Sequence, residues 1–465
     1  MGSLDVIASS PHAVLFPFMS KGHTIPILHL ARLLLHRKLS VTIITTPLNL
    51  PFISTSLSDT AASFVTIPFP THIDDTIPDN IESTDKLPCM SLFVTFANAT
   101  KRMKPDFDRV LSEFARVDFL VSDGFLTWTY ESAASLNIKH IVTYGMCTYA
   151  CSINRDNFHL LMDKRLDSVD ELFESPSFPW IKLCSDDFGD PWNRPDPTGP
   201  MLDFVTEVMH LTNKSFGIIF NSVYELERPF VDYWAKNCNP KPFCLGPLCL
   251  SEPINKAQIE KRKWIEWLDS NGPEAGPVLY AAFGSQAALS ETQLQELAKG
   301  LESSGVRFLW VVKSGDLRKI ETWDVGFLKR VKERGMVVSD WVNQREILSH
   351  EAVKGFLSHC GWNSVTESLC AGVPILAWPM MAEQHLNARM VVEELKVGVR
   401  AETCDGTVRG FVKAEGVERS VKRLFGHEEV RRRVAEVKEM AAAAVAEGGS
   451  SWRALTELID EASMK

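Results

Sequence analysis

The chain has 465 residues, of which 45% are hydrophobic and 23% are charged, and its formal net charge at pH 7 is -10. This length exceeds what a single hydrophobic core usually supports, so two globular domains are expected. An acidic chain without a basic stripe is poorly suited to a phosphate backbone, and we therefore expect no nucleic-acid partner.

The N-terminal residues MGSLDVIASSPH contain no basic segment followed by a long apolar one, and no later stretch approaches 18 uninterrupted apolar residues. We therefore expect a cytoplasmic protein that is neither secreted nor inserted in a membrane. The 10 cysteines form no CxxC pair, which favours reduced thiols. The glycosylation sequons at Asn98 and Asn213 are interpreted as chance occurrences, because no secretory signal precedes them.

In the first half of the chain, apolar runs rich in β-branched and aromatic residues alternate with helical patterns. Residues 12–18 (HAVLFPF) and 41–46 (VTIITT) are predicted strands, and a helix is predicted to start at Pro26, where a first-turn proline is tolerated. Two more strands are predicted at 118–123 (DFLVSD) and 140–144 (HIVTY). This βαβ alternation is typical of a parallel sheet with covering helices.

A second βαβ series begins near residue 277. Its predicted strands are VLYAAFGS, RFLWVVK, MVVSDW, KGFLSHCG and VPILAWP. The residues between the two series, 239–257, are dense in proline and glycine and show no periodicity. We therefore predict an N-terminal domain at 1–245, a linker at 246–257 and a C-terminal domain at 258–449, with a helix at 450–465 crossing back onto the first domain.

Residues 341–384 place polar side chains where predicted strands end and helices begin. The strand that ends at His359 passes through Gly361 into a helix that starts with Asn363 and Ser364. Free backbone N–H groups and the helix dipole therefore point above this turn. Such a helix start suits a diphosphate.

Two further side chains of this stretch fit a nucleotide. Glu367 lies one helical turn after the predicted helix start, so its carboxylate can reach the same end of the site and accept bonds from both hydroxyls of a ribose. Trp341, at the end of a predicted strand, offers a flat face for a base. The stretch therefore predicts a nucleotide site.

This stretch closely resembles the signature box of plant family-1 UDP-dependent glycosyltransferases, over all 44 positions from 341 to 384. The resemblance continues through SKGHTIP near the start, VSD at 121–123, LGPL at 245–248, FGS at 283–285 and GGSS at 448–451. It implies an α/β protein of the GT-B fold, in which two Rossmann-like doubly wound parallel-sheet domains face a central cleft. The implied activity is the inverting transfer of glucose from UDP-glucose to a hydroxyl of a small lipophilic acceptor, giving a β-glucoside.

The resemblance also implies which residues bind the donor. Trp341 would stack on uracil, Gln344 would lie near the uridine, and Glu367 would bind the ribose. The diphosphate would be held by Ser285, His359, Asn363 and Ser364, and the sugar by Trp362, Glu383 and Gln384. Thr143 aligns with a further sugar contact, although a strand threonine is as often structural. Gln384 usually accompanies glucose donors in the family, whereas Glu383 replaces a commoner aspartate.

His23 follows the first predicted strand, where ligand-facing residues of doubly wound sheets lie. In the resembling family this histidine is the general base, and an imidazole that titrates near neutrality suits that task. Asp123, at the end of its predicted strand, would hold the other ring N–H and stabilise the imidazolium. From the residues alone, His23 could also be a loop histidine and Asp123 a helix N-cap.

The acceptor site is harder to predict from sequence, because it is built from the long loops 68–93 and 182–197. A slot for a flat hydrophobic acceptor, such as a phenolic or flavonoid, is expected. The residues expected to line it are Phe18, Phe93, Phe125 and Leu126.

Several alternatives stay open. The same base could direct attack through an aromatic carbon and give a C-glycoside, and the fold could belong to a non-catalytic nucleotide-sugar-binding protein or to an enzyme that uses the donor alone. A nicotinamide oxidoreductase is nearly excluded, because no GxGxxG follows a strand. No cofactor or metal is expected, since the acidic pair Asp106 and Asp108 falls in a helix-like polar stretch. The resemblance suggests a monomer.

Overall fold

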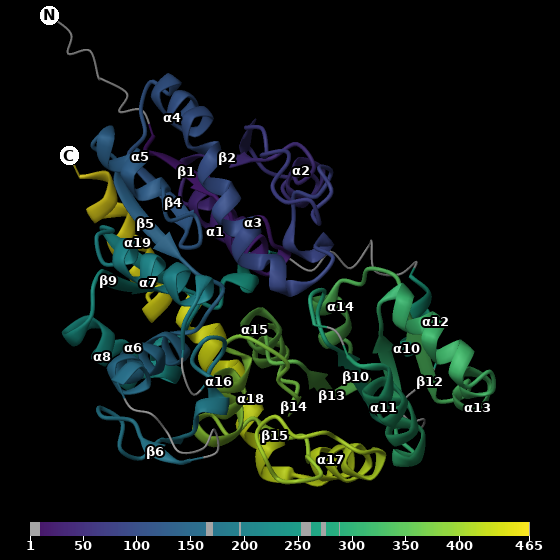
Figure 1. The fold of residues 1–465 in the computed structure, drawn as a ribbon. Coiled ribbons are helices and arrows are strands. Elements are labelled where there is room, and N and C mark those ends of the chain that lie inside the picture. Colours follow the sequence, from purple (N-terminus) through teal and green to yellow (C-terminus); the bar gives the residue numbers. More distant parts are fainter. Residues whose placement is uncertain are drawn as a thin grey trace, which may run out of the picture.

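The computed structural model describes residues 10–163, 171–194, 197–252, 262–270, 276–287 and 289–464. The chain folds into two α/β domains, drawn purple to teal and green in Figure 1, and each domain is a parallel sheet covered by helices. The predicted fold class is therefore confirmed.

The N-terminal domain has a seven-stranded parallel sheet in the order β3-β2-β1-β4-β5-β8-β9. Its strands are β1 (His12–Phe16), β2 (Ser40–Thr45), β3 (Ser63–Thr66), β4 (Phe119–Asp123), β5 (Lys139–Thr143), β8 (Gly217–Phe220) and β9 (Lys241–Cys244). The helices are α1 (Lys21–His36), α2 (Leu50–Ser56), α3 (Phe93–Ala99), α4 (Lys104–Glu113), α5 (Thr129–Ser135), α6 (Thr148–Asp163), α7 (Pro200–Thr212) and α8 (Tyr224–Asn237). A short hairpin joins β6 (Phe173–Glu174) and β7 (Lys182–Leu183).

The C-terminal domain has a six-stranded parallel sheet in the order β12-β11-β10-β13-β14-β15. Its strands are β10 (Val278–Ala282), β11 (Arg307–Val311), β12 (Gly335–Val338), β13 (Val353–Ser358), β14 (Ile375–Ala377) and β15 (Gly398–Arg400). The helices are α10 (Lys263–Asp269), α11 (Glu291–Ser304), α12 (Ser314–Trp323), α13 (Phe327–Val331), α14 (Gln344–Leu348), α15 (Trp362–Ala371), α16 (Gln384–Arg389) and α17 (Ala414–Gly426). The order of its first five strands repeats that of the N-terminal sheet.

The central strand of each sheet supplies two cores. In β1, Val14 and Phe16 pack into one buried cluster, while Ala13 and Leu15 pack into another. Because alternate side chains of a strand point to opposite faces, this division requires a sheet with both faces covered. The near-continuous apolar sequence of the strand follows from that burial.

Helix α1 begins five residues before the predicted start, so the prediction that Pro26 opens it was wrong. The carbonyl of Ser20 accepts the N–H groups of His23 and Thr24 at 3.0 and 2.8 Å, which winds the first turn from Lys21 onward. Pro26 then lies inside the helix, and because it has no N–H it leaves the carbonyl of Gly22 without its helical donor. That carbonyl instead accepts a hydrogen bond from the side chain of Asn363 in the C-terminal domain.

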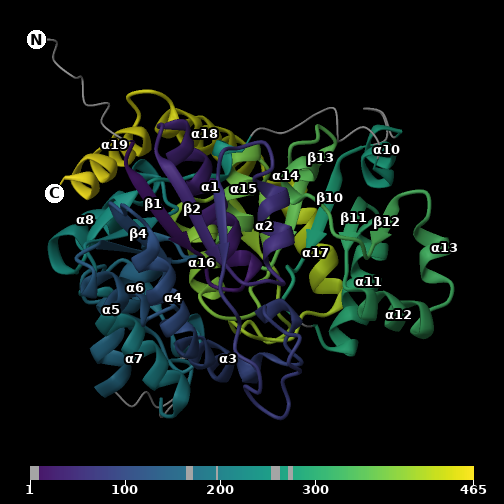
Figure 2. The same cartoon turned by 90° about the horizontal axis from the view of Figure 1, so that it is seen from above.

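Helices α18 (Glu428–Val445) and α19 (Ser450–Ser463) return the chain to the N-terminal domain, as the yellow ribbon shows in Figure 2. On α19, Leu455, Leu458 and Ala462 are buried in the same cluster as β1 and α1. Lys241 of β9 contacts carboxylates of this helix. The predicted linker begins after β9, and its positions 253–257 lie outside the described residues.

No helix within the described ranges has the length and apolar character needed to span a membrane. The 10 cysteines are free thiols, as predicted.

Candidate active site

The loops that follow the central strands of the two sheets meet each other. In each sheet the chain order reverses between two neighbouring strands, β1 and β4 in one and β10 and β13 in the other. His23 follows β1 and Asp123 ends β4, whereas Ser285 follows β10 and His359 follows β13. Loops leave such a point in opposite directions, which makes it the ligand-binding position of doubly wound folds.

His23 and Asp123 form a hydrogen-bonded pair at the N-terminal switch point. The imidazole Nδ1 lies 2.7 Å from Asp123 Oδ2, and the backbone N–H of Phe125 donates to the other carboxylate oxygen at 3.0 Å. The carboxylate is 1% exposed and the imidazole 20%. An ionised Asp123 places the ring proton on Nδ1, so Nε2 is left to accept a proton.

The pKa of His23 responds to opposing effects. Burial acts to lower this pKa, but the charge and hydrogen bond of Asp123, with the charge of Glu383, outweigh burial and raise the pKa above its ordinary value. The protonated imidazole is thus stabilised after it has taken a proton. This is the electrostatic environment that a general base requires.

Aromatic rings surround the imidazole. The ring centroid of Phe125 lies 4.8 Å from that of His23, and the centroid of Phe18 lies 5.7 Å away. Phe93 contacts both of these phenylalanines, and Phe204 of α7 contacts Phe93 and Phe125. The predicted acceptor residues Phe18, Phe93 and Phe125 are therefore one cluster beside His23, and Leu126 is buried in the same core.

His359 sits against glycine backbone at the C-terminal switch point. A Cβ atom at Gly361 would lie 2.5 Å from its Nε2, and one at Gly284, where φ is +73°, would lie 2.9 Å from the same atom. Its Nδ1 is buried without a hydrogen-bond partner, and burial lowers the pKa of His359 to about 4. The two glycines therefore make room for a neutral imidazole beside the β10 turn.

The start of α15 combines backbone donors with a polar network. The side-chain nitrogen of Gln344 donates to Glu367 Oε2 at 2.7 Å and to Ser364 Oγ at 2.9 Å. Burial raises the pKa of Glu367 to about 7. The amide of Asn363 donates to the carbonyl of Gly22 at 2.6 Å, the carbonyl that Pro26 leaves free.

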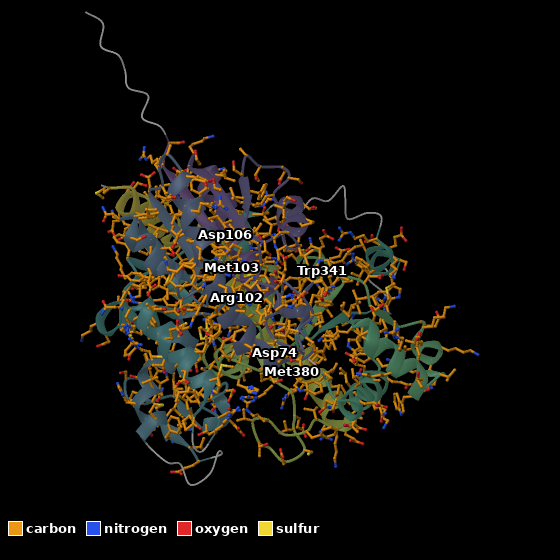
Figure 3. All side chains as sticks on the ribbon, turned by 45° about the horizontal axis from the view of Figure 1, so that its top comes forward. Asp74, Arg102, Met103, Asp106, Trp341 and Met380 are labelled. Atoms are coloured by element: carbon orange, nitrogen blue, oxygen red, sulfur yellow. The ribbon has the colours of Figure 1, made fainter. Side chains whose placement is uncertain are left out.

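Trp341 is 59% exposed, and Figure 3 labels it on the C-terminal half. The ammonium of Lys21, from the other domain, lies 3.8 Å from its ring centroid. The ring is thus largely exposed and carries a cation over one face in this structure.

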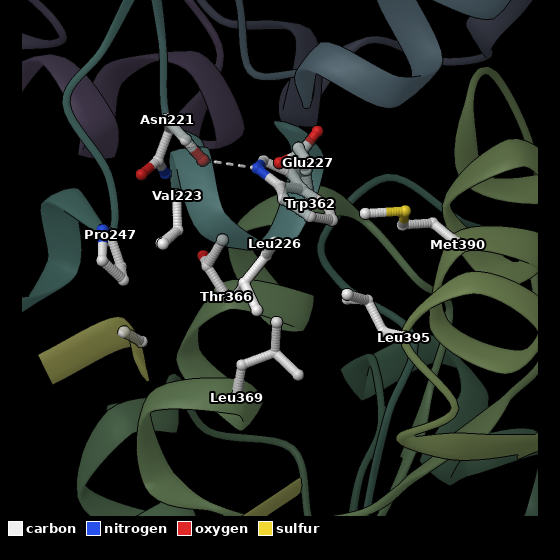
Figure 4. A pocket seen from close by; sticks show the side chains of 11 residues that line it. Asn221, Val223, Leu226, Glu227, Pro247, Trp362, Thr366, Leu369, Met390 and Leu395 are labelled. Atoms are coloured by element: carbon white, nitrogen blue, oxygen red, sulfur yellow. Dashed lines mark hydrogen bonds between the residues drawn. The ribbon is translucent and has the colours of Figure 1, made fainter. Parts of the chain in front are cut away.

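Two predicted donor residues are engaged in packing. The indole of Trp362 is buried, donates to the carbonyl of Asn221 at 2.7 Å and lines a small cavity with Glu227 (Figure 4). A sugar contact from Trp362 would therefore come from its backbone N–H at the first helical position. The hydroxyl of Thr143 donates to the carbonyl of Ile219 at 3.1 Å, which favours the structural interpretation.

Glu383 and Gln384 open α16 on the side facing His23. Burial raises the pKa of Glu383, and the charge of His23 acts on the same carboxyl in the opposite direction. The side-chain oxygen of Gln384 accepts the N–H groups of Met380 and Met381, each at 3.0 Å. These bonds fix the orientation of the Gln384 side chain.

The acidic pair on α4 is engaged in ion pairs along the helix. Asp106 contacts Arg109 and Asp108 contacts Lys104, and Figure 3 labels Asp106 on the N-terminal half. Among the described residues, no group of three or more His, Cys, Asp or Glu side chains is placed to hold a metal ion.

Sequence reasoning missed Gln286 and Phe204. Gln286 directly follows the predicted Ser285 but its side chain contacts the N-terminal domain, donating to Ser20 Oγ at 3.1 Å and to Thr84 Oγ1 at 2.6 Å. Phe204 has the apolar spacing of an ordinary helix core residue. No local pattern signals either contact.

The chain is similar in sequence to known plant glycosyltransferases. The family model described as "UDP-glucoronosyl and UDP-glucosyl transferase" matches residues 253–421. The chain is 50% identical to UDP-glycosyltransferase 90A1 of Arabidopsis thaliana, covering 98% of both chains. It is 35% identical to scopoletin glucosyltransferase of Nicotiana tabacum, covering 97% of this chain and 98% of the relative.

The fold of the chain is also similar to solved structures of plant glycosyltransferases. A Glycyrrhiza uralensis glycosyltransferase complexed with glycyrrhetinic acid 3-O-monoglucuronide is 30% identical with a TM-score of 0.85, covering 97% of this chain and 96% of that one. A Phytolacca americana glycosyltransferase complexed with UDP-2-fluoro-glucose and pterostilbene is 29% identical with a TM-score of 0.81, covering 98% and 100%.

Proposed function

Because this chain belongs to the plant family-1 UDP-dependent glycosyltransferases, enzymes that transfer a sugar from a UDP-sugar to a small acceptor, we propose that it makes β-glucosides. The donor is UDP-glucose, and the acceptor is a hydroxyl of a small lipophilic molecule. Phenolics and flavonoids are the proposed acceptor class. His23 is the base and Asp123 its partner.

The observation that carries this proposal is the His23–Asp123 pair beside the aromatic cluster. Its 2.7 Å hydrogen bond orients the imidazole, and the buried carboxylate supports a positive charge on the ring. A phenol that packs against Phe125 would bring its hydroxyl toward Nε2. This arrangement supports proton removal from an acceptor as the step that His23 performs.

The reaction then runs as an inverting displacement. The acceptor proton moves to His23 Nε2, and the acceptor oxygen bonds to the anomeric carbon from the face opposite UDP. The bond from that carbon to the diphosphate oxygen breaks, UDP leaves, and an α-linked donor sugar becomes a β-glycoside. Asp123 stabilises the imidazolium formed.

The donor end supplies neutral hydrogen-bond donors for the departing diphosphate. The first N–H groups of α15 and the side chains of Ser285 and Asn363 stand at one switch point, where a helix start favours negative charge. Glu367 accepts the ribose hydroxyls and Trp341 stacks on uracil. This set requires no metal ion in the proposed mechanism.

Two relatives support a phenolic acceptor and a glucose donor. Besides the scopoletin enzyme, a UDP-glucose flavonoid 3-O-glucosyltransferase of Fragaria ananassa is 33% identical over 97% of this chain. Gln384 and Glu383, held at the start of α16, are the proposed contacts to the glucose hydroxyls. The same base would also serve an acceptor that attacks through carbon, so C-glycosylation is the alternative outcome of the test.

The test is turnover of UDP-glucose, UDP-galactose and UDP-xylose against a panel of phenolic and terpenoid acceptors, followed by mass spectrometry. We expect a product heavier by one hexose with a phenolic acceptor, cleaved by acid as an O-glycoside. An acid-resistant product would replace this proposal with C-glycosylation. UDP binding without any product would instead favour the nucleotide-sugar-binding protein.

A further inference from the structure

The segment just before His23 is contacted by three side chains of the other domain. Gln286 donates to Ser20 Oγ, and Asn363 donates to the carbonyl of Gly22. The third contact joins the ammonium of Lys21 to the ring of Trp341. The first turn of α1, which carries His23, is therefore positioned in part by the C-terminal domain.

Gln286 differs from Asn363 and Trp341 because its side chain contacts two buried residues of the N-terminal domain. Its amide bridges the hydroxyls of two buried residues, Ser20 (4% exposed) and Thr84 (2% exposed). The backbone N–H of Thr84 donates to the carbonyl of Met19 at 2.9 Å, so the loop carrying Thr84 is tied to the same turn. Gln286 thus links two N-terminal loops at one point.

Ser20 transmits this contact to the base. Its carbonyl accepts the N–H of His23 at 3.0 Å, and its backbone is the N-cap of α1. A displacement of Ser20 would move the start of the helix and with it the imidazole. A displacement of a catalytic group by about 1 Å can lower the reaction rate by roughly 100-fold.

The other two contacts come from residues that the proposed function also assigns to the donor. Under that function, Trp341 stacks on uracil and Asn363 faces the diphosphate, so both residues serve two partners. Gln286 is assigned no donor contact, although it follows Ser285 on the β10 turn. Its bonds to Ser20 and Thr84 therefore remain available during the reaction.

We propose that Gln286 is a positioning residue, which couples the donor domain to the placement of His23 through Ser20. This inference rests on the proposed function, because it assumes that His23 is the base. Gln286 does not touch substrate in it. Its effect is on the geometry of proton removal, and so on kcat, more than on donor affinity.

The test compares two acceptors of similar shape in the variant Gln286→Ala. One is a phenol that is neutral at the assay pH, and the other is its nitro-substituted analogue, which is already ionised and needs no base. We expect kcat with the neutral phenol to fall between about 10- and 100-fold, while kcat with the ionised analogue falls less than about threefold. His23→Ala should show the same selectivity, and UDP affinity by calorimetry should be retained.

Two further variants separate positioning from general loosening of the interface. Ser20→Ala should reproduce the selectivity with a smaller loss, because the bond from Gln286 to Thr84 remains, and the double variant should be no worse than Gln286→Ala alone. Glu252→Ala removes another interdomain contact, to His29 and Arg345, and should affect the two acceptors equally.

Equal losses with both acceptors in Gln286→Ala, or no loss at all, would overturn the inference. A wild-type protein that makes no product with any acceptor would instead overturn the proposed function. The two failures are therefore distinguishable.

Discussion

The two switch points of this molecule share a topology and differ in chemistry. Both lie where the chain order reverses between two adjacent strands, β1 and β4 in one sheet and β10 and β13 in the other. The N-terminal one holds a titratable pair, with the pKa of His23 raised by Asp123. The C-terminal one holds a histidine that burial keeps neutral, with a pKa of about 4, packed on two glycines beside a helix start.

This difference indicates a division of labour. The fold fixes where ligands bind, whereas the side chains decide what happens there. Under the proposed function, the buried carboxylate bonded to His23 makes that histidine a base, and the uncharged donors with free backbone N–H groups at α15 make an anion site. Variants of the first region should therefore impair the chemical step, and variants of the second should impair donor binding.

The largest effect is expected from Asp123→Asn. The amide cannot hold His23 in the same tautomer or stabilise its positive charge, so kcat should fall by about 10³- to 10⁴-fold. UDP affinity, measured by calorimetry, should be unchanged. Asp118→Asn is the matched control at the other end of β4, where the carboxylate contacts Arg116, and it should retain turnover.

The pH profile sharpens this prediction. The base works as neutral imidazole, and the raised pKa of His23 means that this form is lost as pH falls through a value above the ordinary one of about 6.5. The acidic limb of kcat/KM should therefore lie above that value in the wild type and move to lower pH in Asp123→Asn. A limb that does not move would disconnect Asp123 from the base.

The next largest effect is expected from Gly284→Ala. The added methyl group would lie 2.9 Å from His359 Nε2 and displace the imidazole, so UDP affinity should fall about 10- to 100-fold. Gly305→Ala is a close control, because φ is +71° there against +73° at Gly284 and nothing lies within 4 Å. The left-handed backbone should cost each variant about 1 kcal/mol of stability, the clash should add to the loss in Gly284→Ala, and equal UDP affinities would contradict this role for Gly284.

A smaller effect should follow from the pH dependence of Glu367. Burial raises the pKa of Glu367 to about 7. Only the ionised carboxylate has both oxygens free to accept hydrogen bonds from the two ribose hydroxyls. UDP should therefore bind more weakly as pH falls through that value, by up to about tenfold between pH 8 and pH 6. In Glu367→Gln this dependence should flatten, and a slope identical to that of the wild type would exclude the carboxylate.

The smallest effect is expected from Phe204→Leu. Leucine fills most of the space but loses the ring contacts to Phe93 and Phe125, so the KM for a phenolic acceptor should rise about threefold. UDP affinity should not change. Phe107→Leu, which alters an aromatic pair with Phe16 elsewhere in the same domain, serves as the control.

The polar groups at the start of α15 could be placed from sequence because their geometry is local. A strand that ends at His359, a glycine and a helix start set Ser364 and Glu367 on one end of the helix, where both accept from Gln344. The fold class followed in the same way from alternating strand and helix patterns.

The remaining features depend on contacts between distant segments. Gln286 and Ser20 are 266 positions apart, and only the docking of the two domains brings them together. Phe204, on α7 of the N-terminal domain, meets Phe93 and Phe125 only through the packing of distant segments within that domain. The start of α1 was misplaced for a local reason, since a proline fits the first turn of a helix and is also tolerated where its missing N–H leaves a carbonyl with another partner.

The most direct test of the central claim is one paired measurement on His23→Ala, comparing turnover of UDP-glucose by mass spectrometry with UDP affinity by calorimetry. We predict that transfer to a neutral phenol falls by at least as much as in Asp123→Asn, about 10³-fold or more, while UDP binds as in the wild type. Retained transfer would show that the base lies elsewhere, and lost UDP binding would show that the two switch points do not divide catalysis and donor binding as described.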